Sequence, residues 1–184
     1  MALFSTTALT DMTTKQHSTQ EAQGSGLLKG EILAYAGHRP DKLGGWNPTH
    51  PVVGRVKAAL RGSLVDLAPS MVISGMALGV DQWVAWESVG LGIPFTAALP
   101  CDGMDEAWPE RSRAEFRRLL AHAARVHVVS PGPYKPWKMQ RRNEWMVDNS
   151  DRLITVHDGS LGGTYNCIRY AESVLRPIYS LSWR

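Results

Sequence analysis

The stretch Ser74-Gly75-Met76-Ala77-Leu78-Gly79-Val80-Asp81 joins an apolar run to a helical pattern. Residues 71–73 before it predict the end of a buried strand, and residues 82–87 after it begin a predicted helix. Glycines at such a junction let the backbone approach a ligand closely. The start of the helix adds free N–H groups and the positive end of a dipole. The stretch therefore indicates a strand-to-helix turn that suits a phosphate group.

Short apolar runs alternate with helical patterns along most of the chain, and no internal repeat is present. The predicted strands are residues 31–36, 71–74, 93–99, 125–129, 152–157 and 177–181, and the predicted helices are about 49–65, 78–91, 110–123, 138–149 and 163–175. Thr49 is the predicted N-cap of the first helix. Strands that are apolar throughout are expected to be buried on both faces. This alternation predicts an α/β fold, a three-layer sandwich around a mostly parallel sheet with right-handed crossovers.

The bulk composition is typical of one globular domain. The chain has 184 residues, 43% of them hydrophobic, and a formal net charge of +3. Its longest basic cluster fits the solvated face of a helix better than a nucleic-acid patch, so nucleic acid is not an expected partner. That cluster consists of Arg111, Arg113, Arg117 and Arg118. The two cysteines, Cys101 and Cys167, lack the spacing of a zinc site, which indicates a reducing compartment and no metal.

The N-terminal region differs in composition from the remainder. Residues 1–28 are rich in Ser, Thr, Gln and Gly, so we predict a disordered tail there and a single domain over residues 29–184. Met12 is an alternative initiator that the sequence leaves open. No run approaches the ~18 apolar residues of a membrane span, and no basic segment precedes an apolar one as in a secretory signal. We expect a cytoplasmic protein without a membrane partner.

Ligands of open parallel sheets bind beyond the carboxyl ends of the strands, so the turns after the first, second and fifth strands are the expected site. In the last turn, Gly162, Gly163 and Thr164 form a second glycine-rich junction, with a tight turn capped by Thr as the alternative. Arg142-Asn143 lies in the helix before the fifth strand, where Arg suits a phosphate and Asn a base or sugar. The alternative there is a surface position. Two glycine-rich junctions on one sheet edge favour a nucleotide-type ligand.

These motifs resemble segments of known families. Residues 74–81 resemble the SG-x-A-x-G-[IV]-D segment of the DNA-processing protein A family, and Arg142-Asn143 with residues 146–151 resembles its RN…SD segment. Gly162-Gly163-Thr164 resembles the late turn of the lysine-decarboxylase-like, "lonely guy" proteins. Together they resemble the SLOG superfamily of Rossmann-like proteins. The nearest pattern is its YpsA-like (DUF1273) branch, which is matched by residues 36–40, residues 79–83 with Glu87, Arg142-Asn143 and Asp148.

The resemblance covers residues 31–181 and implies a Rossmann-like domain with a pocket for a nucleotide or nucleotide-derived molecule. By matching position, the glycine-rich turns would form a phosphate cradle, Arg39 and Arg142 would supply positive charge, and Asn143 and Asp81 would contact sugar or base. No cofactor is required. The expected ligand-binding residues are Gly37, His38, Arg39, Ser74, Gly75, Met76, Gly79, Asp81, Arg142, Asn143, Asp158, Gly162, Gly163 and Thr164.

The chain departs from the phosphoribohydrolase branch of the superfamily, in which acidic residues, including a catalytic Glu, follow the GT pair. Here Tyr165, Asn166 and Cys167 follow Thr164, so that Glu is absent. We therefore favour a sensor or sequestering protein over an enzyme.

The alternative is a hydrolase that cleaves an N-glycosidic bond of a nucleoside monophosphate or NAD-like compound. It needs a carboxylate near the sugar, for which Asp81 and Glu87 are the candidates. His38 fits an acid/base role, with a structural role or a contact to phosphate as the alternative. Trp83 and Trp86, three residues apart, fit the core or a contact between subunits, which makes a homo-oligomer the expected assembly.

Overall fold

The structure of the protein is a computed structural model that describes residues 30–184. The predicted tail and Met12 lie outside the described residues. The strands are β1 (Ile32–Gly37), β2 (Met71–Ser74), β3 (Phe95–Leu99), β4 (Arg125–Val128), β5 (Arg152–Val156) and β6 (Ile178–Ser180). The helices are α1 (Pro51–Leu67), α2 (Val80–Leu91), α3 (Glu110–His122), α4 (Pro136–Asp148) and α5 (Gly163–Ser173), and a short 3-10 helix, η1 (Pro40–Lys42), follows β1.

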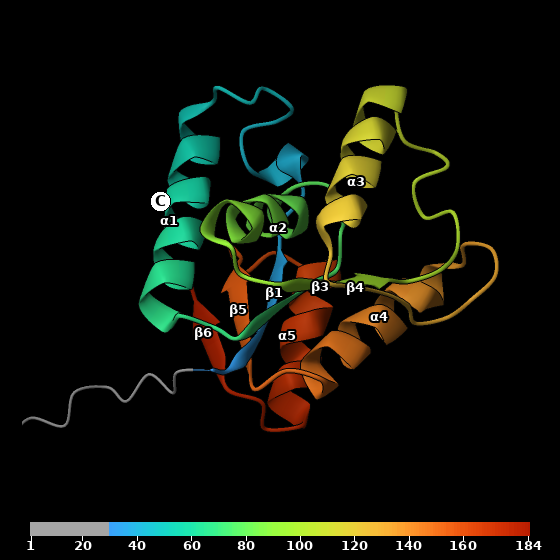
Figure 1. Ribbon diagram of the computed structural model, residues 1–184. Coiled ribbons are helices and arrows are strands. Elements are labelled where there is room, and N and C mark those ends of the chain that lie inside the picture. The colour runs from blue at the N-terminus through green and yellow to red at the C-terminus, as the bar shows by residue number, and fades with distance from the viewer. Residues whose placement is uncertain (1–29) are drawn as a thin grey trace, which may run out of the picture.

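The strands form one sheet in the order β4-β3-β2-β1-β5-β6, and every neighbouring pair is parallel. The chain runs outward from β1 to β4 and then returns to the other side of β1 for β5 and β6. Helices α1, α2 and α3 cover one face of the sheet, and α4 and α5 cover the other (Figure 1). The predicted Rossmann-like three-layer α/β/α sandwich is thereby confirmed.

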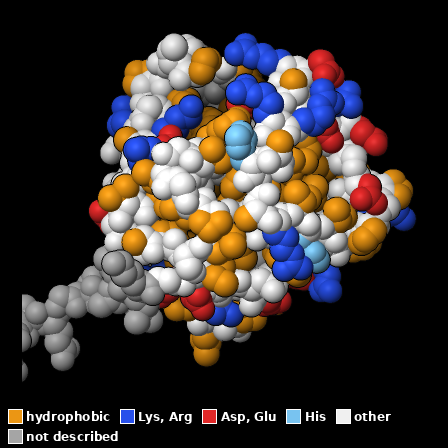
Figure 2. Space-filling model, in the orientation of Figure 1, with side chains coloured by type: hydrophobic (Ala, Val, Ile, Leu, Met, Phe, Trp, Pro, Cys, Tyr) orange, Lys and Arg blue, Asp and Glu red, His pale blue; other side chains and the backbone are white. Residues whose placement is uncertain are grey.

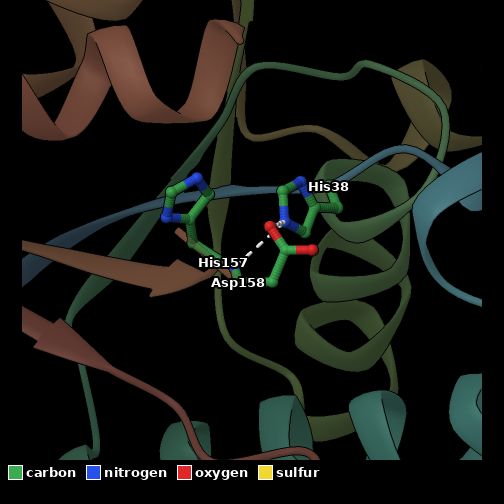
Figure 3. A group of neighbouring side chains, drawn as sticks. All are labelled: His38, His157 and Asp158. Carbon is green, nitrogen blue, oxygen red and sulfur yellow. Dashed lines mark hydrogen bonds and ion pairs between the residues drawn. The ribbon is translucent and has the colours of Figure 1, made fainter. Parts of the chain in front are cut away.

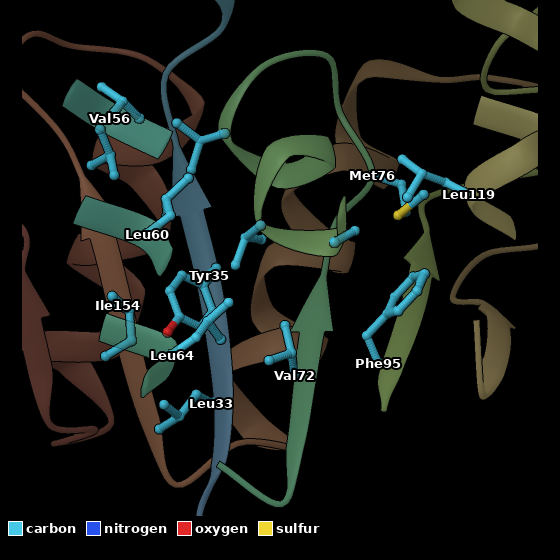
Figure 4. Packing of buried hydrophobic residues seen from close by; sticks show 14 of the residues in the cluster. Leu33, Tyr35, Val56, Leu60, Leu64, Val72, Met76, Phe95, Leu119 and Ile154 are labelled. Atoms are coloured by element: carbon cyan, nitrogen blue, oxygen red, sulfur yellow. The ribbon is translucent and has the colours of Figure 1, made fainter. Parts of the chain in front are cut away.

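The two faces of the sheet carry separate cores. On β1, Leu33 and Tyr35 point toward α1–α3, and Ala34 and Ala36 toward α4 and α5, as the period of two in a strand requires. Figure 4 shows the larger core, in which leucines of α1 pack on the sheet. The Tyr35 hydroxyl lies 3.0 Å from Ser63 Oγ, and burial raises the pKa of Tyr35 to about 12. Each fully buried large apolar side chain contributes roughly 1.5–3 kcal/mol.

Two strands differ from the expectation of burial on both faces. β4 and β6 are the edges of the sheet, and none of their residues is buried. In β4, the Val126 side chain is 47% exposed. An edge strand has a neighbour on one side only, and the covering helices pack mainly over the centre of the sheet. The apolar sequence of these runs could not reveal their edge position.

Two of the helix starts that differ from the sequence prediction have a local cause. The N-cap of α1 is His50 and not Thr49, because His50 Nδ1 accepts a hydrogen bond from the Val52 N–H at 3.3 Å. Helix α2 begins at Val80, after Gly79, whose φ of 102° is outside the helical region. Glycine adopts this backbone conformation at no steric cost, whereas other residues are strained there.

The basic cluster on α3 faces acidic side chains. Arg113 and Arg117 pair with Glu110, and Arg118 pairs with Glu115. Figure 2 shows acidic and basic side chains interspersed over this helix, at the upper right of the view. Trp83 and Trp86 of α2 are partly buried against the larger core. Among the described helices, none combines the length and the apolar character that crossing a membrane demands.

Candidate functional site

The candidate site lies where the strand order reverses. β1 has β2 on one side and β5 on the other, and the crossovers from these strands leave on opposite faces of the sheet. A crevice forms at such a point because the adjoining loops diverge. Here it is a cavity of about 410 Å³ beyond the carboxyl ends of β1 and β5.

Nine of the fourteen residues expected to bind a ligand line this cavity, although they come from four separate segments of the chain. They are Gly37, His38, Arg39, Asp81, Arg142, Asn143, Gly162, Gly163 and Thr164. Further lining residues that the sequence did not point out are Asp41, Lys42, Met139, Ser160, Leu161 and Cys167. Asp41 and Lys42 belong to η1, directly after the predicted turn. Two charged residues directly after a predicted ligand turn were the sequence signal that could have identified them as lining residues.

The turn between β2 and α2 supports the cavity wall from behind. Ser74, Gly75, Met76 and Gly79 are not among the residues that line the cavity. The Ser74 hydroxyl donates to the Asp81 carbonyl at 2.7 Å and accepts from the Met76 N–H at 3.2 Å. Met76 is fully buried with a φ of 60°. A Cβ on Gly79 would lie 2.6 Å from the His38 carbonyl oxygen. The glycines therefore allow close contact with protein atoms.

Arg142 and Asp81 form a buried ion pair at the base of the cavity. Arg142 is 4% exposed and Asp81 6% exposed, with Nη1 and Oδ2 3.5 Å apart. Nη1 also donates to the Gly75 carbonyl, and the Ala77 N–H donates to Asp81 Oδ2 at 3.3 Å. Burial raises the pKa of Asp81, and the Arg142 guanidinium counteracts that rise. Arg142 Nε is buried without a hydrogen-bond partner among the described residues.

The N-terminus of α5 opens on the same cavity. Its N-cap is Gly162, with a φ of 150°, and no side chain of residues 30–184 caps the helix. Thr164 is the second helical residue, so the alternative of a Thr N-cap is not what the structure has. Asn143 Nδ2 donates to the Gly163 carbonyl at 3.2 Å, which ties α4 to this turn. Lys42 Nζ donates to Ser160 Oγ at 2.6 Å and to the Leu161 carbonyl at 3.3 Å. A cation and an uncapped helix start thus meet at one end of the cavity.

His38 and Asp158 link the ends of β1 and β5. His38 is 4% exposed, and its Nε2 lies 2.8 Å from Asp158 Oδ1 (Figure 3). Burial lowers the pKa of His38, while Asp158 acts against that shift. Hydrogen bonds from Ser160, together with His38, hold the pKa of Asp158 well below its usual range. Asp158 was expected to touch a ligand, but it contacts His38 and does not line the cavity.

His38, His157 and Asp158 are close enough to be considered as metal ligands. One potential ligand atom from each lies within 4.8 Å of the others. Both nitrogens of His157 are engaged, however. Nε2 lies 2.8 Å from the Ser160 carbonyl, and Nδ1 accepts from the Gly159 N–H at 3.2 Å. Binding a metal through His157 would break one of these contacts, so the arrangement fits a loop support.

Glu87, the second carboxylate considered for catalysis, lies apart from the cavity. Its Oε2 is 3.1 Å from Arg61 Nη1, a pair that joins α2 to α1. Glu87 does not line the cavity. Of the two carboxylates, Asp81 is the one that lines the cavity.

Comparison with known proteins places this geometry in a family. Residues 33–173 match the family described as the YspA SLOG family. The SPbeta prophage-derived protein YoqJ of Bacillus subtilis (strain 168) is 34% identical over 116 residues, which cover 54% of this chain and 68% of that protein. A UPF0398 protein of Lysinibacillus sphaericus (strain C3-41) is 26% identical over 149 residues, covering 76% of this chain and 83% of the relative.

Solved structures show the same fold at low sequence identity. DNA processing protein A of Helicobacter pylori, described for its single-stranded DNA binding mode, has a TM-score of 0.61 at 21% identity, covering 86% of this chain and 68% of that one. DNA processing protein A of Streptococcus pneumoniae has a TM-score of 0.59 at 18% identity, covering 84% of this chain and 51% of the other. These likenesses support the fold.

Proposed function

The chain belongs to the YspA SLOG family, and we propose that it binds a nucleotide or nucleotide-derived small molecule beyond the carboxyl ends of β1 and β5. Its role in this proposal is that of a sensor or sequestering protein for the molecule. No cofactor takes part. The membership alone supports a nucleotide-related ligand, and the assignment of the site comes from the cavity.

One observation carries the proposal: the uncapped start of α5, Arg39 and Lys42 all border one cavity of about 410 Å³ at the switch point of the sheet. Free N–H groups and the helix dipole attract an anion, and two cations reinforce them. The volume falls within the range of small-molecule sites, roughly 300–1,000 Å³. A carboxylate from η1, Asp41, borders the same space and offers acceptors for sugar hydroxyls.

The second candidate function, hydrolysis of an N-glycosidic bond, is supported by Asp81, because this carboxylate lines the cavity. A reaction of this kind needs a carboxylate near the sugar carbon. Asp81 Oδ2 is already held by Arg142 and by the Ala77 N–H. Those contacts favour a structural carboxylate, so binding without turnover is the function we put first.

The first test is to incubate the purified protein with a pool of nucleoside monophosphates, NAD, ADP-ribose and cyclic nucleotides, followed by filtration and mass spectrometry. Depletion of one compound, recovered intact after denaturation, is the expected result. New free base or sugar phosphate would favour the hydrolase instead. A single-stranded oligonucleotide is filtered with the protein in a parallel sample. If the protein retains the oligonucleotide and depletes no compound of the pool, nucleic-acid binding would replace the proposal.

A matched pair of variants then locates the site. Lys42→Gln removes an exposed cation that borders the cavity, and Lys57→Gln removes one on α1 that borders a separate hollow. A charge-assisted hydrogen bond contributes about 1.5–3 kcal/mol. Calorimetry should therefore show weaker binding of the phosphate-bearing compound by Lys42→Gln and unchanged binding by Lys57→Gln. Equal affinities in both variants would remove the phosphate from this end of the cavity. Light scattering of the native protein checks self-association.

A further inference from the structure

We propose that His38 presents a fixed hydrogen-bond acceptor to the cavity and thereby selects ligands with free sugar hydroxyls, namely ribonucleotides over their 2′,3′-dideoxy counterparts. The inference rests on the proposed function, since it assigns a specificity determinant to the same cavity. Nothing in the family resemblance assigns this role to the residue. It follows from the position of one proton.

The proton of the neutral His38 ring resides on Nε2. Asp158 Oδ1 lies 2.8 Å from Nε2, and Asp158 is held ionised chiefly by the Ser160 N–H, which donates to Oδ1 at 3.0 Å. An ionised oxygen at that distance from an unprotonated nitrogen would repel it. The Asp158 N–H is also directed at Nε2, at 3.1 Å, and by itself would favour a proton on Nδ1, but the shorter contact with a full charge decides the tautomer.

This tautomer leaves Nδ1 with a lone pair. Figure 3 shows that the second ring nitrogen of His38 lies on the side of the ring away from Asp158. Nδ1 makes no hydrogen bond to residues 30–184, whereas both hydrogen-bond contacts of the ring are at Nε2. Since His38 lines the cavity and its Nε2 is engaged by Asp158, we assign Nδ1 to the cavity side of the ring. Burial lowers the pKa of His38, which keeps the ring neutral. Nδ1 therefore accepts hydrogen bonds and donates none.

An acceptor at this position determines which part of a nucleotide faces it. Phosphate oxygens accept hydrogen bonds as well, so the phosphate is excluded from Nδ1 and directed to α5 and Lys42. The two ends are joined by one short loop, because Asp158 contacts His38 while Ser160 contacts Lys42. The sugar is the part of a nucleotide adjacent to its phosphate. Its hydroxyls are donors, and they satisfy Nδ1.

The test is calorimetric and uses pairs of ligands. AMP, GMP, CMP and UMP are each compared with the 2′,3′-dideoxy form, so that base preference cancels within a pair. Loss of one hydrogen bond with an acceptor left unsatisfied corresponds to about tenfold weaker binding of the dideoxy compound. That difference is expected for each nucleotide that binds.

Two variants connect the preference to the His38 tautomer. In Asp158→Ala the carboxylate is gone and the backbone N–H of residue 158, 3.1 Å from Nε2, is the partner that remains, so the ring proton moves to Nδ1 and the acceptor is lost. The ribonucleotide should then lose its advantage while the dideoxy compound binds as before. Arg184→Gln is the matched control, because it removes the other ion pair of Asp158 and leaves the Nε2 contact intact. It should keep the preference.

Nitrogen-15 NMR of the His38 ring gives an independent reading that needs no variant. A protonated Nε2 and an unprotonated Nδ1 are expected at neutral pH. The opposite tautomer would overturn the inference, and so would equal binding of both members of every pair by the native protein. In the latter case the proposed function stands. If no nucleotide of either kind binds, the proposed function fails together with the inference.

Discussion

The buried pair of Arg142 and Asp81 predicts a large and specific loss of stability when one partner is removed. At 3.5 Å, with an effective dielectric constant of about 20, the attraction is roughly 4–5 kcal/mol. Removing one partner of a buried pair costs about 3–5 kcal/mol, because the other charge stays buried without compensation. Arg142→Met keeps most of the apolar volume, so we expect a decrease of that size in the free energy of unfolding.

The assay is a double-mutant cycle by urea unfolding with Arg142→Met, Asp81→Asn and the double variant. The double variant lacks both charges, so its loss should be smaller than the sum of the two single losses by at least about 2 kcal/mol. The loss in Arg142→Met should also shrink toward pH 5. Without the guanidinium the pKa of Asp81 rises further, and protonation relieves the buried charge. Single losses that add to within about 0.5 kcal/mol would refute the reasoning.

Three further outcomes are expected. Gly79→Ala should destabilise the protein by about 1–3 kcal/mol, because the φ of Gly79 is 102° and the new Cβ would clash with the His38 carbonyl. Gly62→Ala on α1, which has open space around it, should be neutral or stabilising. Equal effects of the two substitutions in thermal melts would contradict this prediction. A thiol reagent at pH 8 should not label Cys101 or Cys167 until urea is added, because both are buried and the pKa of Cys167 is raised to about 12. Rapid labelling of either cysteine in the folded protein would contradict this prediction. As the pH decreases below about 6.5, the free energy of unfolding should decrease, because His38 takes up a proton in the unfolded chain and resists it in the folded protein. His38→Gln should reduce the slope of the stability profile in this pH range. An unchanged slope would mean that other groups cause the pH dependence.

The layer architecture could be predicted because the period of hydrophobic residues determines it. All six strands and all five helices begin and end within two residues of the expected positions, and β3 begins at Phe95 instead of residue 93, since Pro94 cannot donate to a ladder. The strand order could not be predicted. Which strands lie at the edges depends on tertiary packing, so the exposure of β4 and β6 was missed.

The candidate site could be predicted only in part, because the sequence gives the turns and not the direction in which their side chains face. The switch-point rule correctly placed the turns after β1 and β5 together. The pattern of residues 74–81 predicts a turn that contacts a ligand. In the structure, however, Ser74 contacts Asp81 and Gly75 contacts Arg142, and neither lines the cavity. Both roles need glycine for close approach, and pattern alone does not separate a ligand from a guanidinium.

The charges around the cavity indicate how a phosphate would be held. The charge of Arg142 is matched by Asp81, with which it forms a pair at the base of the cavity. Arg39 and Lys42 have no such ion-pair partner in residues 30–184, and Asp41 is the remaining carboxylate on the cavity wall. Two unmatched cations against one carboxylate leave a single positive charge, to which the start of α5 adds the partial charge of its dipole. That balance suits one phosphate group better than a chain of them, so we expect the loss of Lys42, and not that of Arg142, to weaken the proposed binding while leaving the fold intact.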